Sequence, residues 1–290
     1  MKHYLLIGGS GYVGQAFQEV LEKRDISYRN LSRKEINYYD PQALIEALRA
    51  EKPIAVINAA GYTGKPNVDA CEDDKANCLL GNAVLPGIIR DVCETLDIPW
   101  GHVSSGCIYT GARADGTGFQ EEDIPNFNFR SNNSSFYSGT KALGEEVLSG
   151  AAKNYIWSLR IPFDERNNPR NYLSKLLNYE WLLDAKNSIS QRFEFVEACV
   201  DSFEKEIPYG TYNVTNPGST TARDITAIMK NHGLVTKELK FFESEEDFMS
   251  RAVRTPRSNC TMSSEKLAKI GIQLTEVNES IEKACLNWIA

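Results

Sequence analysis

The sequence has no run of about 18 apolar residues, the length that marks a membrane-spanning helix, so no transmembrane helix is expected. At the N-terminus, "MKHYLLIGGSG" has only the apolar residues of "YLLI" before its glycines. That stretch is too short for the apolar core of a signal peptide and is typical of a buried strand. We therefore expect a cytoplasmic protein.

Paired cysteine motifs and an excess of positive charge are also missing. The seven cysteines are odd in number and none is spaced as C-x-x-C, which argues against a disulfide framework and a zinc site. We expect no bound metal. Lysine and arginine total 32 against 39 aspartates and glutamates, giving a net charge of −7, and no basic run occurs. This balance argues against nucleic acid or an anionic membrane as a partner.

The first half of the chain alternates between short apolar segments and longer amphipathic ones. Strands are predicted at 3–8, 26–31, 54–61, 100–105 and 155–161, and helices at 12–24, 41–52, 75–95 and 136–150. Asp40 and Pro41 form a typical helix start, as capping residue and first-turn proline. This alternation predicts an α/β fold, a Rossmann-type doubly wound parallel sheet with helices on both faces.

The second half is less regular and is broken by prolines. Helices are expected near 170–185, 221–232, 263–270 and 275–289, with a strand in "GTYNVTN". We therefore expect a Rossmann domain over 1–160, completed by a strand from about 209–215. Residues 161–290 would form a smaller, mainly helical C-terminal region.

A glycine motif follows the first predicted strand and opens the first helix. Glycines at 8, 11 and 14 let the backbone turn tightly and approach a pyrophosphate, whose charge the helix N-terminus favours. The alternative is a flexible turn, but the strand–helix context favours dinucleotide binding. We expect Gly8, Gly11, Tyr12, Val13 and Gly14 to bind the cofactor. The domain over 1–160 is thereby assigned to the cofactor and 161–290 to the substrate.

The residues after the second strand bear on the choice of cofactor. An acidic residue is usual there in enzymes that use NAD, because it binds the ribose 2′-hydroxyl. This chain has Ser32, Arg33 and Lys34 instead. Positive charge suits a 2′-phosphate, so Ser32 and Arg33 predict NADP(H), with NAD(H) and a solvated basic turn left as alternatives.

One tyrosine stands out among 13. Only Tyr137 has a lysine four residues on, and residues at that spacing share a helix face. The ammonium of Lys141 would then make the phenol of Tyr137 a usable acid near neutral pH. Ser105, at the end of a neighbouring predicted strand, adds a hydroxyl to this pair. A chance Y-x-x-x-K is the alternative.

With these residues the chain resembles the extended short-chain dehydrogenase/reductase family. The resemblance rests on the glycine motif, "NAAG" at 58–61, Asn82, Ser105 and the Tyr137–Lys141 pair. It implies that Tyr137 is the general acid, that Lys141 binds the ribose and that Ser105 holds the reacting carbonyl. It also implies a homodimer formed through the helix that carries Tyr137. The further cofactor contacts that it implies are Asn58, Ala59, Ala60 and Asn82.

Cys107 follows Ser105 by two residues, so both side chains would face one side if the strand continued. A thiol beside a carbonyl-binding hydroxyl could exchange a proton on a neighbouring carbon, although small buried thiols are common. The loop is similar to that of nucleotide-sugar epimerase/reductases, above all the enzymes that make nucleotide-linked rhamnose. The stretches similar to theirs are "GKPNVDACE", "SGCIYTG", "GFQEEDIPNF", "FYSGTKA", "NPRNYLSK", "VTNPG" and "TPRSN".

The resemblance to the rhamnose enzymes implies a second proton-transfer group at Lys175. GDP-fucose synthases use a histidine for this role, and this chain has no histidine between the Tyr137–Lys141 pair and His232. A solvated helix lysine is the alternative. Arg170, Asn171 and Arg257 are candidates to hold the substrate's diphosphate or hydroxyls, with structural ion pairs as the alternative. Asn67 and Ser105 complete the expected contacts to the substrate, together with Cys107.

The resemblance implies a bifunctional 3,5-epimerase/4-reductase acting on UDP- or dTDP-4-keto-6-deoxyglucose with NADPH. Three features depart from the rhamnose enzymes: Ala70 in place of a tryptophan, a longer loop at 126–135, and residues 186–204. Because of these differences, the resemblance does not fix which sugar and which nucleotide the substrate contains. A 4-reductase without epimerase activity and a non-catalytic regulatory subunit are the rival hypotheses.

Overall fold

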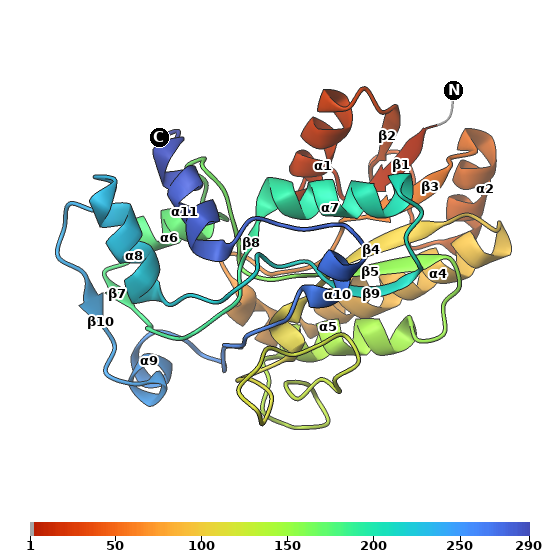
Figure 1. Ribbon diagram of the computed structural model, residues 1–290. Coiled ribbons are helices and arrows are strands. Elements are labelled where there is room, and N and C mark those ends of the chain that lie inside the picture. The colour runs from red at the N-terminus through yellow and green to blue at the C-terminus, as the bar shows by residue number, and fades with distance from the viewer. Residues whose placement is uncertain (1–2) are drawn as a thin grey trace.

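The computed structural model describes residues 3–290 and contains a six-stranded parallel sheet in the order β2-β1-β3-β4-β5-β9 (Figure 1). This is the Rossmann-type α/β fold expected from the sequence. Parallel neighbours need crossover connections, and helices supply most of them. The strands are β1 (Tyr4–Ile7), β2 (Tyr28–Leu31), β3 (Ala55–Asn58), β4 (Trp100–Ser105), β5 (Asn154–Leu159) and β9 (Gly210–Asn213).

Both faces of the sheet are covered, because successive residues of each strand point to opposite sides. Leu6 of β1 packs with Phe17 of α1 and Phe195 of α7 on one face, whereas Leu5 packs with Ile89 of α4 on the other. The helices of these two layers are α1 (Tyr12–Lys23), α2 (Pro41–Glu51), α3 (Lys75–Leu79), α4 (Leu85–Thr95), α5 (Phe136–Val147), α7 (Arg192–Glu204) and α10 (Glu265–Lys269).

The remaining C-terminal elements gather at the left of Figure 1, beyond the end of the sheet. Phe163, Leu173, Ile225 and Ile281 belong to a separate core there. The elements are α6 (Tyr172–Asn178), α8 (Ala222–Asn231), α9 (Glu245–Arg251), α11 (Val277–Leu286) and the two-residue strands β6 (Pro162–Phe163), β7 (Trp181–Leu182), β8 (Ser190–Gln191) and β10 (Lys240–Phe241). The chain leaves this region to add α7 and β9 to the sheet, so residues 161–290 contribute to both parts.

Two helix expectations need correction. The helix expected at 170–185 ends at Asn178, because Trp181 and Leu182 pair with Lys240 and Phe241 as β7 and β10. The helix α7 was not expected at all. It is buried on nearly every side and carries buried polar residues such as Arg192 and Ser202, so its sequence shows no amphipathic stripe.

The helix expected over 75–95 is present with a π-helical turn, Leu80–Val84, between α3 and α4. Turns of the π-helical type are rare in proteins, and many of those that occur lie at functional sites. This one contains the buried Asn82 and packs against α5. At Gly144 of α5, a Cβ atom would lie 2.2 Å from the carbonyl oxygen of Asn82.

We expect Gly144→Ala to lower the free energy of unfolding by about 1–3 kcal/mol, the usual cost of overpacking. The atom that the new methyl group meets belongs to the backbone, which cannot rotate away as a side chain would. Urea denaturation measures the change. Glu146→Ala, at an exposed position of the same helix, serves as the control and should shift stability by less than about 0.5 kcal/mol. Equal stability of Gly144→Ala and the native chain would contradict this packing.

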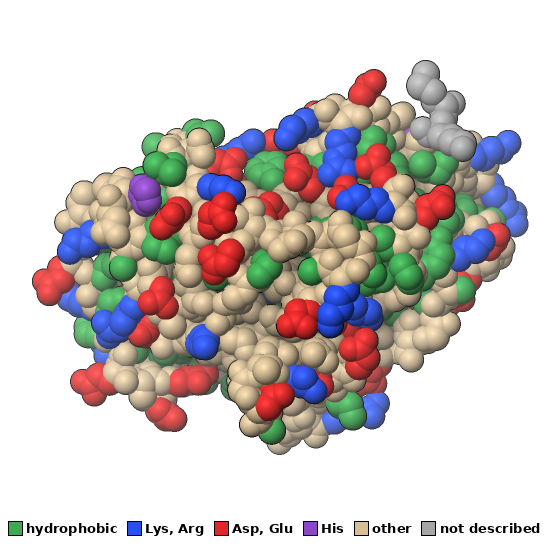
Figure 2. All heavy atoms as spheres, in the orientation of Figure 1, with side chains coloured by type: hydrophobic (Ala, Val, Ile, Leu, Met, Phe, Trp, Pro, Cys, Tyr) green, Lys and Arg blue, Asp and Glu red, His purple; other side chains and the backbone are tan. Residues whose placement is uncertain are grey.

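Acidic and basic side chains are interspersed over the face shown in Figure 2, with no broad field of one sign in that view. Within residues 3–290, no helix is long and apolar enough to cross a lipid bilayer. Among the same residues, no three His, Cys, Asp or Glu side chains gather as a metal site.

Candidate active site

A cavity of about 610 Å³ opens at the carboxyl ends of β1, β3 and β4. Strand β1 lies between β2 and β3, so the crossover connections on its two sides diverge. In doubly wound sheets the crevice at this switch point is where ligands bind. The cavity continues from there to α6 and to the segment around Arg257.

The glycine motif shapes the first end of the cavity. Gly8 has φ +87°, and a Cβ there would lie 2.4 Å from the amide nitrogen of Ala60. At Gly14 a Cβ would lie 2.1 Å from the carbonyl oxygen of Gly8. At Gly11, which precedes α1, a Cβ would meet only that same oxygen, at 3.3 Å. Gly8 and Gly14 thus pack the turn closely, and Gly11 presents the helix N-terminus to the cavity, a cradle that fits a dinucleotide pyrophosphate.

Apart from Asn58, the other residues predicted to bind the cofactor fall into two groups. Tyr12, Val13, Ala59, Ala60, Asn82, Tyr137 and Lys141 all line the cavity. Ser32 and Arg33 lie outside its lining, in the turn after β2. The amide and hydroxyl of Ser32 both donate to the carboxylate of Glu35, at 2.8 and 2.9 Å, whereas Arg33 is exposed. Glu35 is an acidic neighbour that the sequence reasoning did not weigh.

Asn58 is fully buried and does not line the cavity, so its expected contact with the cofactor is corrected. Its side chain accepts from the amide of Ala60 at 3.0 Å and donates to Nδ1 of His102 at 2.9 Å. Burial and the nearby Lys141 lower the pKa of His102 well below its ordinary value, which keeps the ring neutral and able to accept. Asn58 therefore shapes the loop that carries Ala60.

Asn82 holds the same loop from the other side. Its amide group exchanges two 2.8 Å hydrogen bonds with the backbone of Tyr62 and donates to Thr140 of α5 at 3.1 Å. The π-helical turn and the start of α5 are thereby joined to the segment after β3. Asn82 supports the cavity wall by these bonds.

Ser105, Cys107, Tyr137 and Lys141 line the centre of the cavity together. Ser105 ends β4, but the expected extended path to Cys107 is wrong, because residues 106–108 form a 3-10 turn that Ser105 caps. The turn still leaves both side chains on the cavity. The helix α5 places Tyr137 and Lys141 one turn apart, as the spacing predicted, and Lys141 Nζ donates to the carbonyl of Val103 at 3.2 Å.

Burial dominates the proton affinities of this centre. It raises the pKa of Tyr137 well above its ordinary value, and a hydrogen bond with Ser105 offsets only part of that effect. Burial also raises the pKa of Cys107 and lowers that of Lys141. The phenol and the thiol thus hold their protons near neutral pH, and the lowering of the Tyr137 pKa expected from Lys141 is not the prevailing effect.

Two residues that the sequence reasoning missed complete this centre. Glu145 is half-buried one turn after Lys141 and accepts a hydrogen bond from Ser104, and its position i+4 from that lysine could have indicated it. Arg160 lines the cavity just after β5 and donates to Asn187 and to the carbonyl of Ser258. A charged residue at the carboxyl end of a parallel strand is the signal that could have pointed to it.

Lys175 and Arg170 line the far end of the cavity from α6 and the segment before it. Burial, and then the charge of Arg170, lower the pKa of Lys175. Arg257 also lines the cavity and pairs with Asp69 at 2.8 Å. Arg170 donates to Thr63 at 3.2 Å, so both arginines reach the loop after β3.

Two of the expected substrate contacts are not available. Asn171 is fully buried, caps α6 through the amide of Leu173 at 3.0 Å and donates to Asp164 at 2.8 Å. Asn67 is exposed, lies outside the cavity lining and accepts from the amide of Asp69 at 2.8 Å. Their side-chain oxygens bond backbone amides in both cases, which is why an asparagine suits each position.

The sequence matches the family model of the RmlD substrate binding domain over residues 1–288. The chain belongs to this family. The match extends over nearly the whole chain, so it includes the glycine cradle, the central residues and α6. It places the chain among the nucleotide-sugar reductases and epimerases of the short-chain dehydrogenase/reductase family, as the resemblance implied.

Two curated relatives come from Arabidopsis thaliana. A bifunctional dTDP-4-dehydrorhamnose 3,5-epimerase/dTDP-4-dehydrorhamnose reductase is 30% identical over 97% of this chain and 91% of its own length. A trifunctional UDP-glucose 4,6-dehydratase/UDP-4-keto-6-deoxy-D-glucose 3,5-epimerase/UDP-4-keto-L-rhamnose-reductase is 32% identical over 97% of this chain. The chain spans only 41% of the length of that trifunctional relative.

Solved structures share the fold at low identity. The L780 UDP-rhamnose synthase from Acanthamoeba polyphaga mimivirus has a TM-score of 0.90 at 22% identity, over 99% of this chain and 100% of that one. The dTDP-4-dehydrorhamnose reductase from Bacillus anthracis, solved in complex with NADP, has a TM-score of 0.83 at 17% identity, over 99% of both chains. The likeness covers the sheet and the C-terminal region alike.

Proposed function

We propose that this protein is a bifunctional nucleotide-sugar 3,5-epimerase/4-reductase that converts UDP- or dTDP-4-keto-6-deoxyglucose to the nucleotide-linked L-rhamnose. The observation that carries the proposal is the presence of Cys107 and Lys175 in the same cavity as Ser105, Tyr137 and Lys141. A reductase needs only the last three. The curated bifunctional relative at 30% identity supports the same assignment.

The epimerase half uses two groups whose proton affinities are shifted in opposite directions. The ketone at carbon 4 of the sugar acidifies the protons on carbons 3 and 5. Lys175, whose pKa is lowered, removes such a proton, while Ser105 and Tyr137 hydrogen-bond the enolate oxygen. Cys107, whose pKa is raised, returns a proton to the opposite face of the carbon. When the pKa values of two groups in one site are shifted apart in this way, one group can act as the base and the other as the acid.

The reductase half of the reaction acts on the ketone at carbon 4. NADPH, when bound in the cradle of Gly8, Gly11 and Gly14, would supply the hydride for carbon 4. Tyr137 donates its proton to the oxygen as the ketone becomes an alcohol, and the hydroxyl of Ser105 holds that oxygen. The positive charge of Lys141 beside Tyr137 favours the phenolate that this donation leaves.

NADPH is favoured over NADH by the exposed Arg33 after β2 and by the NADP complex of the Bacillus anthracis reductase. We expect Arg33→Ala to raise the KM for NADPH about tenfold or more, because a charge-assisted bond to the 2′-phosphate is lost. The KM for NADH serves as the internal control and should stay within twofold. Steady-state kinetics with both cofactors measures the change. An unchanged KM for NADPH would remove Arg33 from the site.

The proposed function is tested by incubating the chain with NADPH and UDP- or dTDP-4-keto-6-deoxyglucose and identifying the products by NMR. The expected product is the β-L-rhamnose derivative. A product with the configuration at carbons 3 and 5 unchanged would make the protein a 4-reductase only. No turnover with either nucleotide would contradict the proposal as a whole.

We further propose that the protein works in the cytoplasm as a homodimer formed through α5. All seven cysteines are unpaired, which suits a reducing compartment. Val84, in the π-helical turn before α4, and Phe129, which packs against Gly139 of α5, are exposed apolar side chains that a partner could cover.

A further inference from the structure

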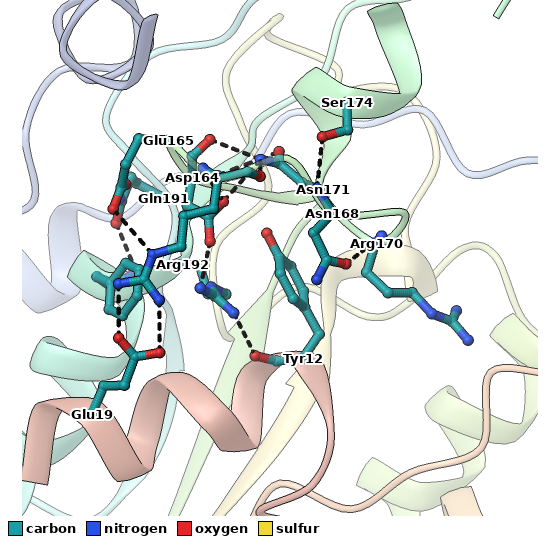
Figure 3. A network of polar contacts seen from close by, with 12 residues as sticks. Tyr12, Glu19, Asp164, Glu165, Asn168, Arg170, Asn171, Ser174, Gln191 and Arg192 are labelled. Atoms are coloured by element: carbon teal, nitrogen blue, oxygen red, sulfur yellow. Dashed lines mark hydrogen bonds and ion pairs between the residues drawn. The ribbon is translucent and has the colours of Figure 1, made fainter. Parts of the chain in front are cut away.

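A buried polar network lies between the glycine cradle and α6, and none of the reaction steps above uses it (Figure 3). At its centre Asp164 and Arg192 form an ion pair, with 2.6 Å between Oδ2 and Nη2. Asp164 has no exposed surface and Arg192 is 3% exposed. Such a pair is weak evidence for stability, because removing both charges from water costs about as much as their attraction returns.

Arg192 reaches the cofactor side. It is the first residue of α7, and its Nη1 donates to the carbonyl oxygen of Tyr12 at 2.9 Å. Its guanidinium also lies 4.2 Å from the centre of the Tyr12 ring. Tyr12 directly follows Gly11 and lines the cavity, so Arg192 fixes the backbone at the point where a pyrophosphate would meet α1.

Asp164 reaches the substrate side. Its Oδ1 accepts from Nδ2 of Asn171 at 2.8 Å and from the amide of Arg166 at 3.0 Å. Asn171 caps α6, and its carbonyl accepts the amide of Lys175 at 3.1 Å. The carboxylate thus holds the first turn of the helix that presents Lys175 to the cavity.

We propose that Asp164 and Arg192 are a positioning pair. They hold Lys175 and Arg170 at a fixed place relative to the loop of Gly11 and Tyr12. Neither residue of the pair touches the reacting atoms. The pair joins the loop at Tyr12 to the cap at Asn171. It thereby fixes the position of Lys175, the group that takes a proton from the substrate, relative to the cofactor. A misplacement of about 1 Å can cost about 10²-fold in rate. The inference rests on the proposed function for the role given to Lys175.

The test compares three forms of the full chain with the native protein: Asp164→Asn, the double variant Asp164→Asn with Arg192→Met, and Asp201→Asn. The double variant removes both charges at similar volume and guards against the loss of folding that one unpaired buried charge can cause. Asp201→Asn is the matched control, because Asp201 of α7 also pairs with an arginine next to α1, Arg24, at 2.6 Å but far from Tyr12. Thermal melting establishes that each form is folded.

Two rates are measured on each form: solvent-deuterium exchange into the 4-keto sugar without cofactor, and kcat for its reduction by NADPH. We expect both folded variants of the pair to lose about tenfold or more in exchange and to lose less in reduction, since Lys175 acts only in the first. The KM for the sugar should change by less than threefold, and the control should match the native protein. Exchange and reduction within twofold of native in the folded double variant would overturn the proposal.

The outcome separates this inference from the proposed function. Absence of exchange in the native protein would contradict the epimerase half of that function alone. The positioning role of the pair would then be judged on reduction, because Arg192 holds the loop at Tyr12 and Arg170 directly precedes Asn171, which Asp164 holds. A kcat lowered more than twofold with an unchanged KM would support it, and a kcat within twofold of native would overturn it.

Discussion

Replacing Cys107 by serine is expected to lower the rate of inversion at carbons 3 and 5 of the 4-keto sugar by at least about 10²-fold, the scale of a general acid. The thiol is buried, lines the cavity beside Ser105, and keeps its proton because burial raises its pKa. A serine hydroxyl occupies the same place but is a far weaker acid. The proton that enters the opposite face of the carbon would therefore have no suitable donor.

The same variant should still reduce a sugar that already has the L configuration, such as UDP-4-keto-L-rhamnose. Tyr137, Ser105 and Lys141 are untouched, so kcat for that substrate should stay within about threefold. Cys260→Ser is the matched control: Cys260 is buried in the same apolar cluster, but its thiol donates to the carbonyl of Gly106 instead of lining the cavity. A native rate of inversion in Cys107→Ser would show that another group returns the proton.

Replacing Tyr137 by phenylalanine is expected to lower kcat for reduction by about 10²–10⁴-fold. The phenol is the proton donor to the carbon 4 oxygen, and burial keeps it protonated. Exchange should fall as well, because the enolate oxygen loses one of its two hydrogen bonds. Loss of both activities distinguishes this variant from Cys107→Ser, which loses only one.

The rate of NADPH oxidation in a single turnover measures the effect of Tyr137→Phe apart from product release. Tyr109→Phe provides the comparison, because Tyr109 is buried in the same cluster yet its hydroxyl donates to the carbonyl of Asp123, and it does not line the cavity. The comparison variant should reduce at the native rate. A native rate in Tyr137→Phe would assign the proton to a different donor.

The middle of the sheet could be predicted because β1 and β3 are short, mainly apolar runs buried on both faces. Strand β4 has the expected bounds, and Asp40 caps α2 as its sequence indicated, accepting from the amide of Gln42 at 3.0 Å. Helix α7 could not be predicted in the same way. Its buried Arg192 finds its charge partner, Asp164, in a distant segment. Such long-range pairing leaves no local periodicity to read.

The central residues of the candidate site could be predicted from their spacing along a strand end and a helix. Ser105 and Cys107 follow a strand, and Tyr137 and Lys141 share a helix face, so topology brings them together. Two asparagines show where this reasoning stops. Asn171 and Asn67 have side chains suited to binding a sugar, but each side chain caps the helical segment that follows it. This capping depends on the path of the backbone, which the sequence alone does not show.

The most direct test of the bifunctional assignment is an incubation of the native chain in deuterium oxide with UDP- or dTDP-4-keto-6-deoxyglucose and no cofactor. Proton exchange at carbons 3 and 5 needs only Lys175, Cys107 and the hydroxyls that hold the enolate oxygen. We predict that NMR will show deuterium at both carbons. Absence of deuterium, in a preparation that still oxidises NADPH when given the 4-keto L-sugar, would contradict the epimerase half and leave a 4-reductase.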